Sequence, residues 1–104
     1  MTALFDVQVA SAARRQLRRL PDKVASAVVE FITAVLPENP LRLSKPLAGE
    51  LAGLRSARRG DYRVLIDVDE DERRILVVRI AHRAAAYRPP RPDGPDESRP
   101  SDRQ

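Results

Sequence analysis

The stretch that decides the fold is Leu54–Arg88, LRSARRGDYRVLIDVDEDERRILVVRIAHRAAAYR. Two of its apolar runs, Val64–Val68 and Ile75–Ile80, are rich in β-branched residues and are joined by an acidic segment. Runs of this kind, bounded by charged turn residues, are typical of a β-hairpin. A Gly-Asp turn separates the first run from Gly53–Arg58, which predicts a strand before the hairpin. The pattern therefore predicts a three-stranded meander.

Basic and aromatic residues recur along this meander. Arg58, Arg63 and Arg83 fall close to strand ends, and Tyr87 follows the last strand. In a meander these side chains could converge on one end or one face of the sheet. Clustered guanidiniums beside an aromatic ring suit a phosphate backbone and a stacked base, and this favours an RNA ligand.

Length and composition indicate one soluble globular domain, because the chain has 104 residues, of which 42% are hydrophobic and 33% charged. The absence of cysteine excludes disulfides and thiolate metal sites, and His82 is the only histidine. We therefore expect neither a metal nor another cofactor. No apolar run approaches the ~20 residues of a membrane span, and no signal sequence is apparent, so we expect a cytoplasmic protein without membrane contact.

The net charge of +4 is concentrated in one segment of the chain. Residues 88–104 carry equal numbers of basic and acidic side chains, whereas residues 41–63 carry six basic side chains and two acidic ones. The six are Arg42, Lys45, Arg55, Arg58, Arg59 and Arg63. A local basic patch suits phosphate binding. The acidic segment 69–72 would repel RNA, so we expect it to lie away from the ligand.

Two helices are predicted between a first strand and the meander. Leu4–Val9 alternates apolar and polar residues, as a strand does. Ser11 is a plausible N-cap for a helix to about Leu20, and a second helix spans roughly Asp22–Leu36. Each helix has an apolar stripe that must be buried, so we expect a helical hairpin packed on the sheet.

The predicted fold class is α+β with the element order β-α-α-β-β-β, a helical hairpin packed on a small, mostly antiparallel sheet. Residues 41–52 form a connection with a helical turn. After Tyr87 the sequence becomes rich in proline and poor in apolar residues. We expect a domain over residues 1–88 and a disordered tail over 89–104, because the tail cannot offset its ordering entropy by burial.

This element order, together with several motifs, resembles the RelE/ParE superfamily of bacterial toxins over about residues 3–88. The motifs are LxxLRSARRGDYRVL (51–65), NPLRLSKPL (39–47), Gly60-Asp61-Tyr62-Arg63 and His82-Arg83-xxx-Tyr87. The GDYR element followed by HRxxxY is characteristic of the RelE side. The resemblance implies a microbial-RNase-like fold.

The resemblance also implies an activity. RelE-type proteins are mRNA interferases that cut messenger RNA in the ribosomal A site. The ribose 2′-OH attacks the adjacent phosphate and leaves a 2′,3′-cyclic phosphate, and no metal is required. The implied partners are the ribosome, mRNA and a cognate antitoxin, with a toxin–antitoxin heterotetramer as one form of the complex.

Residue by residue, Arg63 matches the family's arginine at the scissile phosphate, and Arg83 matches a second arginine that stabilises charge or protonates the leaving group. Tyr87 matches the tyrosine that stacks on or orients the reacting nucleotide. Further RNA contacts are predicted for four basic residues of the central segment: Lys45, Arg55, Arg58 and Arg59.

The sequence departs from the family at the paired lysines that precede GDYR, where Leu54 and Ser56 stand instead. An arginine is a poor substitute for the base, because a guanidinium stays protonated. His82 could accept the proton if it faces the site, or it could simply be a packed or surface residue. Two rival functions remain: a ParE-like inhibitor of DNA gyrase without nuclease activity, and an inactive relative that only binds antitoxin or RNA.

Overall fold

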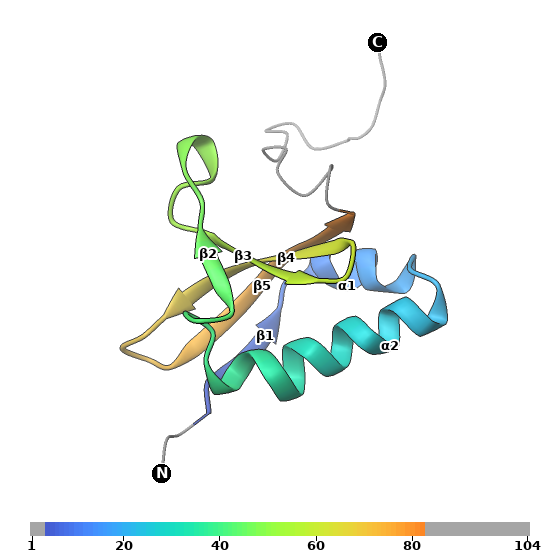
Figure 1. Ribbon diagram of the computed structural model, residues 1–104, viewed down its shortest axis with the longest axis horizontal. Helices are drawn as coiled ribbons and strands as arrows, with labels where there is room; N and C mark the ends of the chain where they lie inside the picture. Colours follow the sequence, from blue (N-terminus) through green and yellow to red (C-terminus); the bar gives the residue numbers. More distant parts are fainter. Residues whose placement is uncertain (1–3, 83–104) are drawn as a thin grey trace.

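A five-stranded mixed sheet forms the centre of the computed structural model, which describes residues 4–82 (Figure 1). The strand order is β1-β5-β4-β3-β2. Strands β2 to β5 pair antiparallel, and β1 pairs parallel with β5. The strands are β1 (Asp6–Val9), β2 (Ser44–Pro46), β3 (Arg55–Arg59), β4 (Tyr62–Asp69) and β5 (Arg74–His82). The predicted α+β class with a mostly antiparallel sheet is confirmed.

The helical hairpin consists of α1 (Ser11–Arg18) and a longer second helix that changes its winding. Regular α-helix covers α2 (Asp22–Glu30), followed by a π-helical turn η1 (Phe31–Val35) and a 3₁₀ turn η2 (Leu36–Glu38). Pro37 has no N–H to give to the carbonyl of Thr33, so the α-helical bonding pattern cannot be completed there. The helix predicted over roughly Asp22–Leu36 is therefore found, with regular α-helical winding only as far as Glu30.

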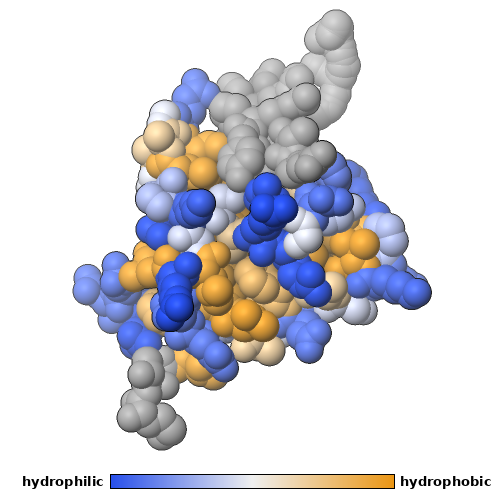
Figure 2. Space-filling model, in the orientation of Figure 1, coloured by the Kyte–Doolittle hydropathy of each residue, from blue (hydrophilic) through white to orange (hydrophobic). Residues whose placement is uncertain are grey.

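Both helices pack on one face of the sheet, here called the helix face, and the core lies between the helices and the sheet (Figure 1). Its fully buried side chains include Val28, Ile32 and Leu36 from the helices and Val64, Ile66, Ile75, Val77 and Ile80 from the sheet. Burying each such side chain contributes about 2 kcal/mol, so this packing dominates the stability of the fold. On its outer side the second helix leaves Val29 and Val35 exposed, and Figure 2 shows apolar surface near the centre of the face that carries α2.

The connection at 41–52 contains a strand that the sequence did not predict. Its first part is β2, which pairs with β3, and the 3₁₀ turn η3 (Gly49–Leu51) follows. β2 is only three residues long and ends in Pro46, so it shows no alternation that could distinguish it from a loop. The strand predicted over 53–58 is found as β3, which begins two residues later and ends one residue later.

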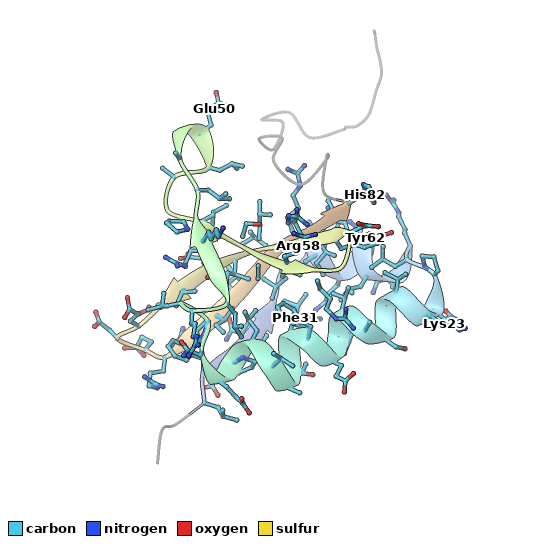
Figure 3. All side chains as sticks on the ribbon, viewed as in Figure 1. Lys23, Phe31, Glu50, Arg58, Tyr62 and His82 are labelled. Atoms are coloured by element: carbon cyan, nitrogen blue, oxygen red, sulfur yellow. The ribbon has the colours of Figure 1, made fainter. Side chains whose placement is uncertain are left out.

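The opposite face of the sheet, here called the open face, carries a smaller apolar cluster. Leu51 of η3 packs there against Leu65 of β4, and Leu47, Leu54, Val78 and Ala81 surround them. The loop that bears η3 projects from the sheet, with Glu50 at its tip (Figure 3). The remainder of the open face is available to polar side chains. The predicted boundary at residue 88 and the tail 89–104 lie outside the described residues.

Candidate phosphate-binding groove

The β3–β4 hairpin sorts its arginines onto two faces of the sheet. Ala57 and Val64 are fully buried on the helix face and pair across the two strands. Because side chains alternate along a strand, Arg58 and Arg63 lie on the open face, where they are direct cross-strand partners. Arg59 belongs to the helix face. The predicted convergence of Arg58 and Arg63 is therefore found.

A groove of about 400 Å³ lies on the open face between the β2 segment and the β3–β4 hairpin. It is lined by Arg42, Leu43, Ser44, Lys45, Pro46, Leu47, Ser56, Arg58 and Arg63. Four of these residues are basic and none is acidic. Like charges placed directly opposite each other repel, so an anion bound between the strands would stabilise the Arg58–Arg63 pair. This basic groove is the candidate site for phosphate.

Arg55 points to the other side and supports the wall of the basic groove. Its Nε donates to Ser44 Oγ at 2.7 Å, and its Nη2 donates to the carbonyls of Leu41 at 3.1 Å and Ser44 at 3.0 Å. Ser44 is buried, and its hydroxyl donates in turn to the carbonyl of Pro40 at 2.5 Å. This network ties the residues before β2 to β3. The guanidinium of Arg55 is thus bound to protein acceptors, and its predicted RNA contact stays a prediction.

His82 lies on the helix face, away from the basic groove. It pairs across the sheet with Tyr62, and the two rings meet edge to face at 5.6 Å and an interplanar angle of 82° (Figure 3). Tyr62, Lys23 of α2 and Arg59 line a second hollow of about 270 Å³ on this side. A catalytic role for His82 stays a prediction, whereas the alternative of a packed or surface histidine matches an exposed side chain in contact with Tyr62.

The acidic β4–β5 turn lies at the far end of the sheet from the arginine pair (Figure 1). Asp69 follows Arg63 by six residues on β4, which corresponds to about 20 Å at ~3.3 Å per residue. The expected separation of the acidic turn from the basic groove is therefore found.

The sequence predicted most of the described groove but not all of it. Of the predicted site residues, Lys45, Arg58 and Arg63 line it, and Arg42 was missed as a site residue. The signal for Arg42 was its membership of the basic segment 41–63. Arg83 and Tyr87, which the resemblance assigns to the catalytic site, lie outside the described residues. Within residues 4–82, no cluster of three or more His, Cys, Asp or Glu could hold a metal, and no helix could cross a membrane.

Known proteins similar to this chain share both its sequence and its fold. The model of the family described as ParE toxin of type II toxin–antitoxin system, parDE, matches residues 7–87. The Mycobacterium tuberculosis toxin RelE is 49% identical over 84 residues, which cover 81% of this chain and 87% of that protein. The toxin RelG of the same organism is 45% identical, with coverage of 81% and 97%.

Among solved structures, the RelBE2 toxin–antitoxin complex from Mycobacterium tuberculosis has a TM-score of 0.76 and 43% identity, covering 81% of this chain and 97% of the matched one. The archaeal RelE–RelB complex from Pyrococcus horikoshii has a TM-score of 0.57 at 22% identity, covers 81% of this chain and 100% of its own, and shares the fold. The family model and the two curated relatives each span most of the folded chain, so this protein belongs to the ParE/RelE family of toxins of type II toxin–antitoxin systems.

Proposed function

We propose that this chain is a RelE-type toxin, an endoribonuclease that cuts messenger RNA in the ribosomal A site and so stops translation. The observation that carries the proposal is the basic groove, in which Arg58 and Arg63 face each other across β3 and β4 with Lys45 on the neighbouring strand. The 49% identity to the toxin RelE supports the RelE side of the family.

The groove suits metal-independent cleavage by the neighbouring hydroxyl. The ribose 2′-oxygen attacks the adjacent phosphorus, the bond to the 5′-oxygen breaks, and the proton lost from the 2′-OH is balanced by one gained by the 5′-oxygen. The intermediate carries extra negative charge on the phosphorus oxygens, and guanidinium donors placed beside it stabilise the transition state. The described part of the groove therefore contributes electrostatic stabilisation, and we assign it to Arg63 with Arg58 as its partner.

The roles proposed for residues 83–88 rest on the family resemblance alone. Arg83 is assigned to the leaving group and Tyr87 to the reacting nucleotide. Arg59 lies on the other face of the hairpin and Arg55 is bound to the β2 segment. We therefore place direct RNA contacts at Lys45, Arg58 and Arg63, and we add Arg42 to them.

The proposed partner is a cognate antitoxin, which acts on the toxin in the cytoplasm. Similar structures are toxin–antitoxin complexes, among them RelBE2 and the intact RelBE complex of E. coli. A groove with four cations and no acid is best covered by a segment that brings carboxylates. Such a segment competes with the phosphate backbone for the same guanidiniums, and this explains how binding would silence the toxin.

The test is an in vitro translation reaction with purified chain, in which message ends are mapped by primer extension with and without ribosomes. We expect cuts at A-site codons only when ribosomes are present, and a 5′-hydroxyl on the downstream fragment, which polynucleotide kinase labels without prior phosphatase treatment. Intact message with unimpaired translation would overturn the proposal. Because the matching family model bears the ParE name, a DNA gyrase supercoiling assay is the next measurement in that case.

Deletion of residues 89–104 should leave cleavage unchanged within about twofold. The basic groove is formed by residues 42–63, and we propose that the toxin domain ends at residue 88. A segment without apolar side chains adds little packing energy. The measurement compares the cleavage rate and the urea midpoint of the truncated and full-length chains. A large loss of either would assign the tail a role in binding or folding.

A further inference from the structure

A side chain of α1 makes a hydrogen bond that reaches across the fold to the end of β5. Gln16 Oε1 accepts the backbone N–H of Ile80 at 2.7 Å, in a partly buried position. The two residues are separated by 64 positions in the sequence. Nothing in the phosphate chemistry described above uses this contact.

The bond fills a gap in the sheet. β1 pairs with β5 only as far as Val9 and Val77, and the last backbone bond between them runs from the Ala10 N–H to the Val77 carbonyl at 2.9 Å. The chain then turns into α1, while β5 continues to His82 without a strand on that edge. A partly buried N–H without an acceptor is costly, so Gln16 takes the place of the missing strand.

The same stretch of β5 contains a bulge. Leu65 pairs with Arg79 and Ile66 pairs with Val77, so Val78 is an extra residue on β5. A bulge bends its strand and changes which side chains face each way. Before it, Val77 faces the core, and after it Ile80 does. Beyond the bulge, the strand could slip by one residue, and every side chain would change face.

The bond from Gln16 is formed in the observed register, in which Ile80 is also buried in the core. It holds the N–H of Ile80 toward α1, and Ala81 is thereby the residue that pairs with Arg63 on the open face. Arg83 follows His82 directly in the sequence. The position of β5 beyond the bulge therefore sets both the neighbour of Arg63 and the point from which the chain enters its predicted catalytic residues.

We infer that Gln16 is a positioning residue of the nuclease site, which acts through the register of β5 residues 78–82 and does not contact RNA. The inference rests on the proposed nuclease function. It predicts that the chemical step depends on the acceptor oxygen at position 16, while binding to the ribosome does not.

The test compares Gln16→Met, which keeps the length of the side chain without its acceptor, with Gln16→Glu, which keeps an acceptor oxygen. Single-turnover cleavage is measured over a series of concentrations of programmed ribosomes. For Gln16→Met we expect the maximal rate to fall about tenfold, since small misplacements of reacting groups are costly, with half-saturation changed less than about twofold. Gln16→Glu should retain the rate within about threefold.

A matched control separates positioning from general stability. Leu17 is the next residue of α1 and packs against the core, so Leu17→Ala destabilises the same helix without touching the bond to Ile80. Below its unfolding temperature this variant should keep the wild-type maximal rate. A rate loss equal to that of Gln16→Met would overturn the inference.

Amide hydrogen exchange at Ile80, measured by NMR, reports the bond itself. We expect exchange to accelerate at least about tenfold in Gln16→Met and to stay slow in Gln16→Glu, because only the first lacks an acceptor. Unchanged exchange in Gln16→Met, or faster exchange with an undiminished cleavage rate, would overturn the inference. Wild-type chain that leaves message intact would instead overturn the proposed function, and the exchange result would still show whether the bond holds β5.

Discussion

Replacing Arg63 with alanine should lower the rate of mRNA cleavage by about 10²–10³-fold, the usual cost of removing one donor that stabilises a developing oxyanion. Arg63 lines the basic groove and is the direct cross-strand partner of Arg58. The arginine is only half-buried, so the variant should fold. Single-turnover cleavage on programmed ribosomes measures the effect. The cleavage rate of Arg63→Lys should lie between those of wild type and Arg63→Ala, because lysine keeps the charge but lacks the paired donors.

The same hairpin supplies the control. Arg59 carries the same charge one residue after Arg58, and it belongs to the helix face. Arg59→Ala should therefore keep cleavage within about threefold of wild type, while Arg58→Ala should lose more. Equal losses in Arg58→Ala and Arg59→Ala would mean that net charge matters and the groove does not. Full activity in Arg63→Ala would remove the phosphate from the proposed position.

Replacing Arg55 with methionine should lower the free energy of unfolding by about 2 kcal/mol, because hydrogen bonds from a charged donor to partly buried acceptors are lost. The change leaves Ser44 Oγ and the carbonyls of Leu41 and Ser44 without this donor. The β2 segment that carries Lys45 should loosen as a result, so half-saturation by programmed ribosomes should rise several-fold. Urea unfolding monitored by circular dichroism gives the first quantity.

This experiment also decides between two roles for Arg55. A direct RNA contact, as the charge pattern of the sequence predicts, would give a variant of normal stability with weakened ribosome binding. If Arg55 supports β2, the variant should lose both stability and ribosome binding. Arg42→Met is the matched comparison, since Arg42 lines the groove. Arg42→Met should weaken binding without lowering the urea midpoint.

The fold was largely predictable because its elements carry strong periodic patterns. The spacing of apolar residues alone predicts the meander from Leu54 onward and the two amphipathic helices. β2 was not predictable, because three residues with a proline carry no period, and the strand is held by its pairing with β3 and by hydrogen bonds from Arg55. Long-range hydrogen bonds define this strand, whereas the local sequence does not indicate it.

The candidate site was predictable in composition more than in geometry. Alternation requires that Arg58 and Arg59 lie on opposite faces, but only the burial of Ala57 shows which of them faces the groove. The face of His82 depends on the bulge at Val78, which adds one residue to the count along β5. A bulge has no reliable sequence signal, so the position of every side chain beyond it requires the structure.

The position of β5 between β1 and β4 has a consequence for the order in which the molecule assembles. During synthesis, β1 has no neighbour in the sheet until residues 74–82 have left the exit tunnel, because its partner is made last among the described strands. The pairing of β1 with β5 joins distant parts of the chain, and such contacts are slow to form. β1 can therefore join the sheet only after all the other described strands have been made.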